Sequence, residues 1–217
     1  MIGRDAATAA LCETAHAVAS RGMVVGSGGN LSVRTGDDLV ITARGAQLAS
    51  LDAAGCVTVA VADAAPPVEG RPSSELPLHR RIYEEHGVGA IVHTHSTYAV
   101  VMSALVDAES AVLPAVHYAS ALLGGEVRVA PYAQFGSEEL GRLTSEGLTG
   151  RRAVLMRNHG AVAVGETLDE ALAVAVNLEW LAQLAYLAAA AGGGTTIDAE
   201  ELERVAERSR TWNEVAR

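Results

Sequence analysis

The sequence predicts an α/β fold in which a mostly antiparallel β-sheet is flanked by helices. Strand-like and helical segments both occur, but they lack the regular strand-helix alternation that is typical of a doubly wound parallel sheet. The chain has 217 residues, of which 49% are hydrophobic, so it can bury one sizeable core. We therefore expect residues 1–217 to form a single domain.

The N-terminal part is predicted to contain one helix and a β-hairpin. Residues 5–21 are rich in alanine and place apolar side chains at helical spacing, and Gly22 can adopt the left-handed conformation that closes a helix. Two short strand-like runs, residues 31–34 and 39–42, surround a Thr-Gly-Asp-Asp turn and indicate a hairpin. A third strand is expected over residues 56–61.

The next helix is expected over residues 75–86, after a loop at residues 64–67. Ser74 can cap this helix, and Pro77 is tolerated in a first helical turn because its missing N–H would have no partner there. Glu75 is therefore predicted to lie at a helix N-terminus.

Buried strands and further helices are predicted for the rest of the chain. Thr167 and Glu170 have the spacing of a capping box, which fixes the start of a long helix that ends near Ala191. The other expected strands are the run ending at His93 and residues 127–130, 153–156 and 161–164. The other expected helices cover residues 96–105 and 198–212.

Composition excludes several classes of partner. A net charge of -10 leaves no concentrated basic surface for nucleic acid. The apolar tract at residues 181–191 is too short to cross a membrane, and the first residues do not read as a signal peptide. Cys12 and Cys56 have no metal-ligand or redox spacing, which favours a reduced, cytoplasmic protein.

The stretch His93-Thr94-His95 indicates a metal site. It ends an apolar run that predicts a buried strand, and side chains two apart on a strand share one face. Two imidazoles can then bind one divalent metal ion. His159 would complete a three-histidine set with an open position, although it also fits an ordinary turn residue before a glycine, and Glu75 also fits an ordinary helix start. The remaining histidines examined, His16, His79 and His86, are interpreted as structural.

Two segments are candidates for binding an anion. Residues 26–30 are rich in glycine but match neither the dinucleotide fingerprint nor the phosphate-binding loop of nucleotide hydrolases. Their N–H groups, with Ser27 and Asn30, could hold an anion, or the segment could be a flexible connection. Ser73 and Ser74 could likewise cap a helix or offer hydroxyl and N–H groups to a phosphate.

Taken in order, these motifs resemble the class II aldolase/adducin family, and within it the L-fuculose-1-phosphate aldolase type. The resemblance extends from Gly26 to about Ala191. The residues that carry it are 27–34, 41–42, 72–75, 93–95, 117–118, 131–136 and 159–160.

The resemblance implies a three-layer α/β/α sandwich that assembles as a homotetramer, with active sites between subunits. It implies one Zn²⁺ or another divalent metal per subunit, held by His93, His95 and His159, with Glu75 as the acid/base. Tyr118 would act from the neighbouring subunit. The implied phosphate-binding residues are Ser27, Gly29, Asn30, Ser73 and Ser74.

The reaction implied by the resemblance is the reversible cleavage of a ketose 1-phosphate, such as L-fuculose 1-phosphate, into dihydroxyacetone phosphate and an aldehyde. Two alternatives use the same metal site: a sugar-phosphate 4-epimerase or dehydratase, and an aldolase with a carboxylate donor of the pyruvate type. A third alternative is a non-catalytic, adducin-like binding module. The intact histidine set disfavours the module, because the metal residues are typically missing on the adducin side of the family.

The sequence departs from the family pattern at Arg44 and in its tail. Relatives follow the Ile-Thr strand with proline, a small hydroxyl residue and glycine, whereas this chain has Ala43-Arg44-Gly45. Arg44 and Gly45 are therefore expected to join the anion site, where a guanidinium can pair with phosphate or carboxylate. Trp212 stands where the aldolases tend to place a catalytic tyrosine.

Overall fold

The computed structural model describes the backbone of residues 3–62 and 70–215 and the side chains up to residue 209 in these ranges. The predicted loop at residues 64–67 and the side chain of Trp212 therefore lie outside the described residues. Within them, seven strands form one sheet in the order β3-β2-β1-β4-β7-β6-β5. The strands are β1 (Asn30–Thr35), β2 (Asp38–Thr42), β3 (Cys56–Ala60), β4 (Ala90–Thr94), β5 (Arg128–Ala130), β6 (Ala153–Met156) and β7 (Gly160–Gly165). All neighbours are antiparallel except β5 and β6, which confirms the predicted mostly antiparallel sheet.

Six α-helices are described. They are α1 (Arg4–Ser20), α2 (Leu76–His86), α3 (Thr97–Leu105), α4 (Glu138–Leu148), α5 (Leu168–Ala190) and α6 (Ala199–Val215). Three short 3-10 helices, η1 (Leu48–Ser50), η2 (Ala53–Gly55) and η3 (Tyr118–Leu123), lie in the connections.

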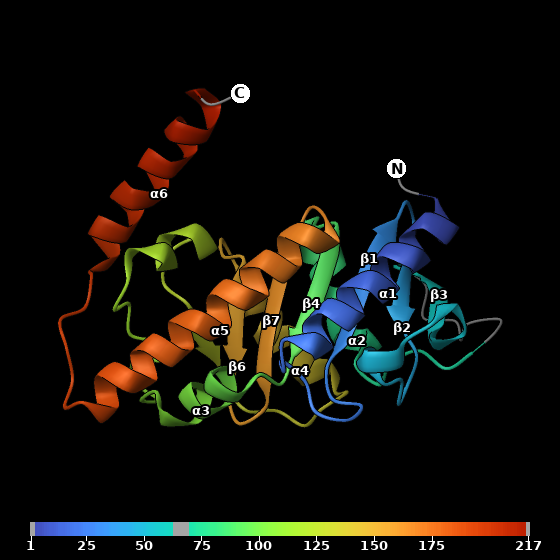
Figure 1. Cartoon of the computed structure of the whole chain (residues 1–217), viewed down its shortest axis with the longest axis horizontal. Coiled ribbons are helices and arrows are strands. Elements are labelled where there is room, and N and C mark those ends of the chain that lie inside the picture. Colours follow the sequence, from blue (N-terminus) through green and yellow to red (C-terminus); the bar gives the residue numbers. More distant parts are fainter. Residues whose placement is uncertain (1–2, 63–69, 216–217) are drawn as a thin grey trace.

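The strands separate two hydrophobic clusters, which makes the fold a three-layer α/β/α sandwich, as expected. Along β4, Ala90 and Val92 pack into one cluster with α1, α3 and α5, whereas Ile91 packs into the other with α2 and α4. This alternation follows from the two-residue period of a strand, which turns successive side chains to opposite faces. Figure 1 shows α1 and α5 lying across one face of the sheet.

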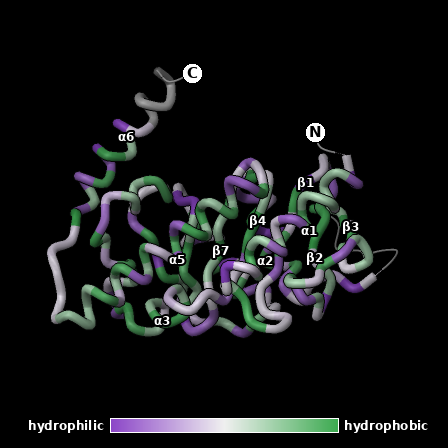
Figure 2. Tube along the Cα trace, viewed as in Figure 1, coloured by the Kyte–Doolittle hydropathy of each residue, from purple (hydrophilic) through white to green (hydrophobic). Residues whose placement is uncertain are grey.

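Helix α5 is the core helix of its layer. Its length and hydropathy would suffice for a membrane span, but the side chains of Leu168, Val174, Leu178 and Leu181 are buried against the sheet. Figure 2 shows hydrophobic residues along α3, α5 and β4, whereas α6 mixes both kinds. Helix α6 projects from the body and is held there through Leu202, which packs with residues before and within η3.

Two sequence-based expectations differ from the structure. Helix α4 was not predicted, although Ser137 caps it by accepting a hydrogen bond from the Leu140 N–H at 3.1 Å. The expectation that Ser74 caps α2 was wrong. The helix begins at Leu76, and Ser73 rather than Ser74 accepts a hydrogen bond from the Glu75 N–H, because the Ser73 N–H is fixed to the Thr42 carbonyl of β2.

The two cysteines are distant in sequence but adjacent in space. Cys12 on α1 and Cys56 at the start of β3 place their sulfur atoms 3.9 Å apart, and both thiols are free. Burial, followed by the neighbouring Cys12, raises the pKa of Cys56 to about 12, so this thiol stays protonated and unreactive at neutral pH.

Candidate metal centre and active site

The ends of three neighbouring strands bring the site together. Asn30 at the start of β1 pairs with His93 near the end of β4, and Thr94 pairs with Ala161 near the start of β7. The hairpin between β6 and β7 carries His159 beside the same edge, with Asn158 in the left-handed conformation (φ 55°) that its turn requires. Antiparallel register therefore assembles residues that are far apart in sequence.

The three histidines form a cluster with the dimensions of a metal centre. Their ring centroids are 4.8–5.0 Å apart, and their ligand nitrogens all lie within 4.8 Å of one another. The Nε2 atoms of His93 and His95 are separated by 3.0 Å, and ligands at ~2.0–2.1 Å in a tetrahedral zinc site are about 3.3 Å apart. The arrangement thus fits three imidazole ligands around one ion.

Two of the three imidazoles are held in the neutral form that metal binding needs. Burial, reinforced by the charge of His93, lowers the pKa of His95 and of His159 to about 4, which keeps both rings neutral. The Nδ1–H of His93 donates to the Ala161 carbonyl at 2.9 Å, so Nε2 faces the cluster. A divalent ion requires neutral imidazoles as ligands. Burial acts to lower the pKa of His93, but Glu75 outweighs it and raises this pKa, so His93 must release a proton when the ion binds.

Glu75 lies beside the histidines and is only 4% exposed. Its Oε2 is 3.0 Å from His93 Nε2, and its Oε1 is 3.3 Å from His159 Nε2. Burial acts to raise the pKa of Glu75, but His93 and the Asn30 amide outweigh it and hold the pKa below its usual range. Among the described residues Oε1 has no hydrogen-bond donor, so this oxygen is available to accept a proton.

A cavity of about 170 Å³ opens onto this cluster. It is lined by Ser27, Gly28, Gly29, Asn30, Ala43, Arg44, Gly45, Ser73, Ser74, Glu75, His95, Phe135 and His159. Of the site residues expected from the sequence, only His93 and Tyr118 do not line it. His93 belongs to the cluster but is fully buried. Tyr118 lies on η3, is stacked on His117 and is 56% exposed.

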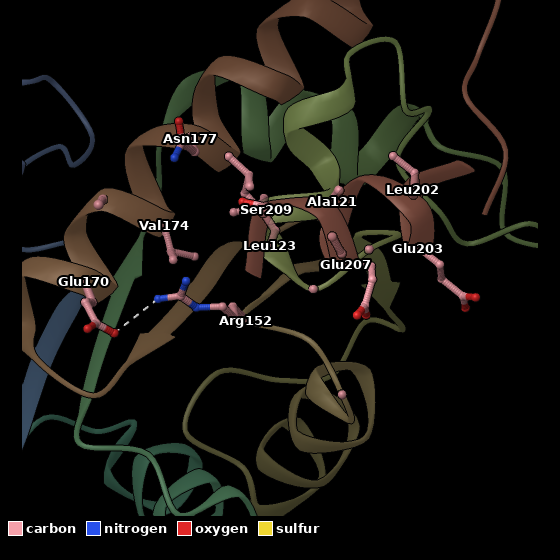
Figure 3. A pocket seen from close by; sticks show the side chains of 16 residues that line it. Ala121, Leu123, Arg152, Glu170, Val174, Asn177, Leu202, Glu203, Glu207 and Ser209 are labelled. Atoms are coloured by element: carbon pink, nitrogen blue, oxygen red, sulfur yellow. Dashed lines mark hydrogen bonds and ion pairs between the residues drawn. The ribbon is translucent and has the colours of Figure 1, made fainter. Parts of the chain in front are cut away.

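A second, larger cavity is a weaker candidate for a functional site. It measures about 1020 Å³ and lies between η3, α5 and the projecting α6 (Figure 3). Its Arg152 is paired with Glu170 at 3.3 Å, which reduces the charge available to a ligand. The histidine cavity is therefore the stronger candidate for catalysis.

Comparison with known proteins identifies the family. Residues 9–186 match the class II aldolase and adducin N-terminal domain. This chain belongs to the class II aldolase/adducin family. The family resemblance deduced from the ordered motifs is thereby confirmed.

The relatives of this family member that carry names are sugar-phosphate aldolases. A 5-methylthioribulose-1-phosphate/5-deoxyribulose-1-phosphate aldolase of Rhodospirillum rubrum is 37% identical over 210 residues, covering 95% of this chain and 92% of that protein. An L-fuculose phosphate aldolase of Escherichia coli K12 is 34% identical, covering 88% of each chain. A solved L-fuculose 1-phosphate aldolase superposes with a TM-score of 0.88 at 32% identity, covering 97% of this chain and 98% of that one. These relatives indicate that the chain is a lyase.

The glycines of the loop before β1 allow the histidines to approach it. A Cβ on Gly28 would lie 2.8 Å from His95 Nδ1, and one on Gly29, which also has a φ of +75°, would lie 2.7 Å from the His93 carbonyl oxygen. Their sequence pattern was interpreted as an anion site or as a flexible connection. The structure adds a steric reason, since a side chain at either position would displace a histidine or the strand that carries it.

Arg44 supplies the only permanently positive side chain among the residues that line the cavity. It reaches the serine pair because Ala43 forms a β-bridge with Pro72 and the Arg44 N–H donates to the Arg71 carbonyl at 2.8 Å. Gly28 and Phe135 also line the cavity but had no assigned role. Phe135 is 65% exposed, and its place inside the family motif at residues 131–136 is the sequence signal that could have found it.

Proposed function

We propose that the chain is a zinc-dependent class II aldolase that reversibly cleaves a ketose 1-phosphate into dihydroxyacetone phosphate and an aldehyde. The observation that carries the proposal is the position of Glu75, whose two carboxylate oxygens lie 3.0 and 3.3 Å from Nε2 of His93 and His159. The names of the relatives support 5-deoxypentulose 1-phosphates and L-fuculose 1-phosphate as the first substrates to test.

His93, His95 and His159 would hold the ion, and their three imidazoles leave a coordination position open toward the cavity. The bound ion would supply Lewis-acid stabilisation of the negative charge that develops when the bond beside a carbonyl breaks. Glu75 performs the proton transfer at the carbon beside the carbonyl, because its Oε1 faces the cluster without a hydrogen-bond donor.

The phosphate would be bound by five lining residues, with Arg44 as the charged partner: Ser27, Gly29, Gly45, Ser73 and Ser74. The role expected for Asn30 changes in this proposal. Its side-chain amide donates to Glu75 Oε2 at 2.8 Å, so it serves the carboxylate rather than the phosphate.

A second copy of the chain completes the site. Tyr118 is exposed on η3 and does not line the cavity of its own subunit, which supports its action as a proton donor from a neighbouring subunit. Two exposed apolar side chains suit a buried contact between copies: Leu122 on the same helix η3, and Trp180, whose ring lies 4.7 Å from that of His117. We accordingly propose a homotetramer, located in the cytoplasm, where thiols such as Cys12 and Cys56 remain reduced.

The decisive experiment supplies zinc-loaded protein with 5-deoxyribulose 1-phosphate and L-fuculose 1-phosphate and measures the release of dihydroxyacetone phosphate. Glu75→Gln should retain zinc but slow exchange of the α-proton of dihydroxyacetone phosphate with solvent by about 10²–10⁴-fold. If neither substrate yields dihydroxyacetone phosphate, the proposal fails. NMR of the products then separates the two alternatives, neither of which breaks the carbon chain. An epimerase yields an isomer of the substrate, whereas a dehydratase yields a product that has lost water.

A carboxylate-donor aldolase is the second candidate, because Arg44 is equally suited to its donor. A guanidinium binds a carboxylate through two parallel hydrogen bonds as well as it binds phosphate. An aldol-synthesis screen with short aldehydes, run in parallel with dihydroxyacetone phosphate and with pyruvate, decides between the two donors. Failure to bind about one zinc per chain would instead support the non-catalytic binding module.

A further inference from the structure

A continuous chain of buried polar side chains runs from the core to Glu75. The Tyr83 hydroxyl is 2.8 Å from Ser32 Oγ, which is 2.6 Å from His79 Nδ1. On the other side of the ring, His79 Nε2 is 2.5 Å from Asn30 Oδ1, and Asn30 Nδ2 is 2.8 Å from Glu75 Oε2. Ser32 and His79 are completely buried, and Tyr83 and Asn30 are nearly so.

The direction of every hydrogen bond in this series follows from Glu75, its last member. A carboxylate only accepts, so the Asn30 amide must turn its NH₂ group to Glu75 and its Oδ1 to His79. Oδ1 also only accepts, so the His79 proton is on Nε2. His79 Nδ1 then accepts from Ser32, and the Ser32 oxygen accepts from Tyr83. Burial lowers the pKa of His79 to about 3, which agrees with the neutral ring that this sequence of donors requires.

We propose that Tyr83, Ser32 and His79 are positioning residues that hold the Asn30 amide, and through it the Glu75 carboxylate, in the orientation for proton transfer. The inference rests on the proposed role of Glu75. These positioning residues explain how Oε2 of the carboxylate is occupied by a fixed donor, whereas Oε1 has no hydrogen-bond donor among the described residues. Without the His79 donor, the Asn30 amide could rotate and present its oxygen to the carboxylate, which would repel Glu75.

The same contacts could merely attach α2 to β1, and two substitutions at one position separate these roles. The amide nitrogen of glutamine can reach the place of His79 Nε2, so His79→Gln keeps the donor to Asn30. His79→Leu removes it while filling most of the volume. We expect kcat for cleavage to stay within about threefold of wild type in the first variant and to fall about 100-fold in the second, with KM little changed, because a carboxylate misplaced by about 1 Å costs that much.

His86 provides a matched control on the same helix. Its Nε2 is 2.7 Å from the Ser145 hydroxyl of α4, so it also joins two elements, but none of its hydrogen bonds leads to Glu75. His86→Leu should therefore reduce stability while leaving kcat unchanged in the folded protein. Equal losses of kcat in His86→Leu and His79→Leu, or wild-type kcat in folded His79→Leu, would overturn the inference.

A spectroscopic measurement tests the inference without turnover. Long-range ¹⁵N–¹H NMR of the wild-type protein reports which ring nitrogen of each histidine carries a proton, and His79 should be neutral with the proton on Nε2. A proton on Nδ1, or on both nitrogens, contradicts the chain of donors even if the enzyme cleaves its substrate. Conversely, the Nε2–H form with no aldolase activity in wild type refutes the proposed function and leaves the hydrogen-bond chain established but without its catalytic purpose.

Discussion

Adding one methyl group at Gly28 should weaken metal binding through His95. The Cβ of Gly28→Ala would lie 2.8 Å from His95 Nδ1 and 3.1 Å from the Val25 carbonyl oxygen, whereas ordinary van der Waals contacts begin at 3.4 Å. The backbone of Gly28 is outside the left-handed region, so the strain falls on the imidazole, which must move by about 0.6 Å. Metal–ligand distances tolerate only about ±0.2 Å, and shifts of ligand orientation cost about 10–100-fold in metal affinity.

The affinity is measured by competition with a chromophoric zinc chelator, alongside a thermal melt of the metal-free protein. The zinc Kd of Gly28→Ala should rise about 10–100-fold, which corresponds to about 1.4–2.7 kcal/mol, and wild-type affinity in the folded variant would refute the steric argument. Gly194→Ala is the control, because its Cβ would have only Ala188 within 4 Å, at an ordinary 3.9 Å, and its backbone is also outside the left-handed region.

Three further predictions follow from the same geometry. Arg44→Ser should raise KM for a ketose 1-phosphate about 10–100-fold with kcat little changed, as expected for uniform binding of a remote group; an unchanged KM would remove Arg44 from the anion site. Because burial lowers the pKa of His79 to about 3, the neutral ring stabilises the fold less as pH falls below the unfolded value near 6.5. Between pH 8 and pH 5 this contribution costs wild type about 2 kcal/mol. His95 and His159, whose pKa values are also lowered, contribute in both proteins, so urea unfolding should show a loss about 2 kcal/mol larger in wild type than in His79→Gln; equal losses contradict the prediction. Removing the metal with a chelator should abolish cleavage and lower Tm, and zinc at 100 times its Kd should restore about 2.7 kcal/mol; a Tm that does not respond to zinc would argue against the three-histidine site.

Local sequence patterns were sufficient for most of the secondary structure but not for α4. The strands carry apolar runs bounded by turn residues, and these signals are local. Helix α4 contains Gly141 and Gly147, which lower helix propensity, and their purpose is visible only in the tertiary structure. A Cβ on Gly141 would lie 3.2 Å from the Leu78 Cα of α2, and one on Gly147 would lie 2.6 Å from Val154 Cγ2 of β6. These glycines allow close packing. The sequence signal that could have predicted the start of α4 is the capping residue Ser137, which is followed by two glutamates.

The candidate site was predictable only in part, because its members meet through long-range register. The spacing of His93 and His95 is local, so the metal hypothesis could be made from residues alone. His159 joins them through the pairing of β4 with β7, and Glu75 joins them through the Asn30 amide and the contact of Ser73 with Thr42 of β2. No local pattern specifies these contacts, and only the family resemblance placed the two residues together. His79 was interpreted as an ordinary structural histidine, since its partners Ser32 and Asn30 are 47 and 49 residues away.

The charge of the whole chain makes the capture of an anionic substrate a short-range event. A net charge of -10 repels a sugar phosphate at long distance, and this field is largely screened beyond about 8 Å at physiological ionic strength. Within that range Arg44, the backbone N–H groups of the glycine-rich loop and the bound metal must together outweigh the repulsion. Added salt should then reduce the repulsion during the approach of the substrate more than it weakens the contacts inside the cavity. Electrostatically steered association slows as salt is added, whereas the association rate of this chain with its substrate should rise or stay constant; a fall in the rate would contradict this view.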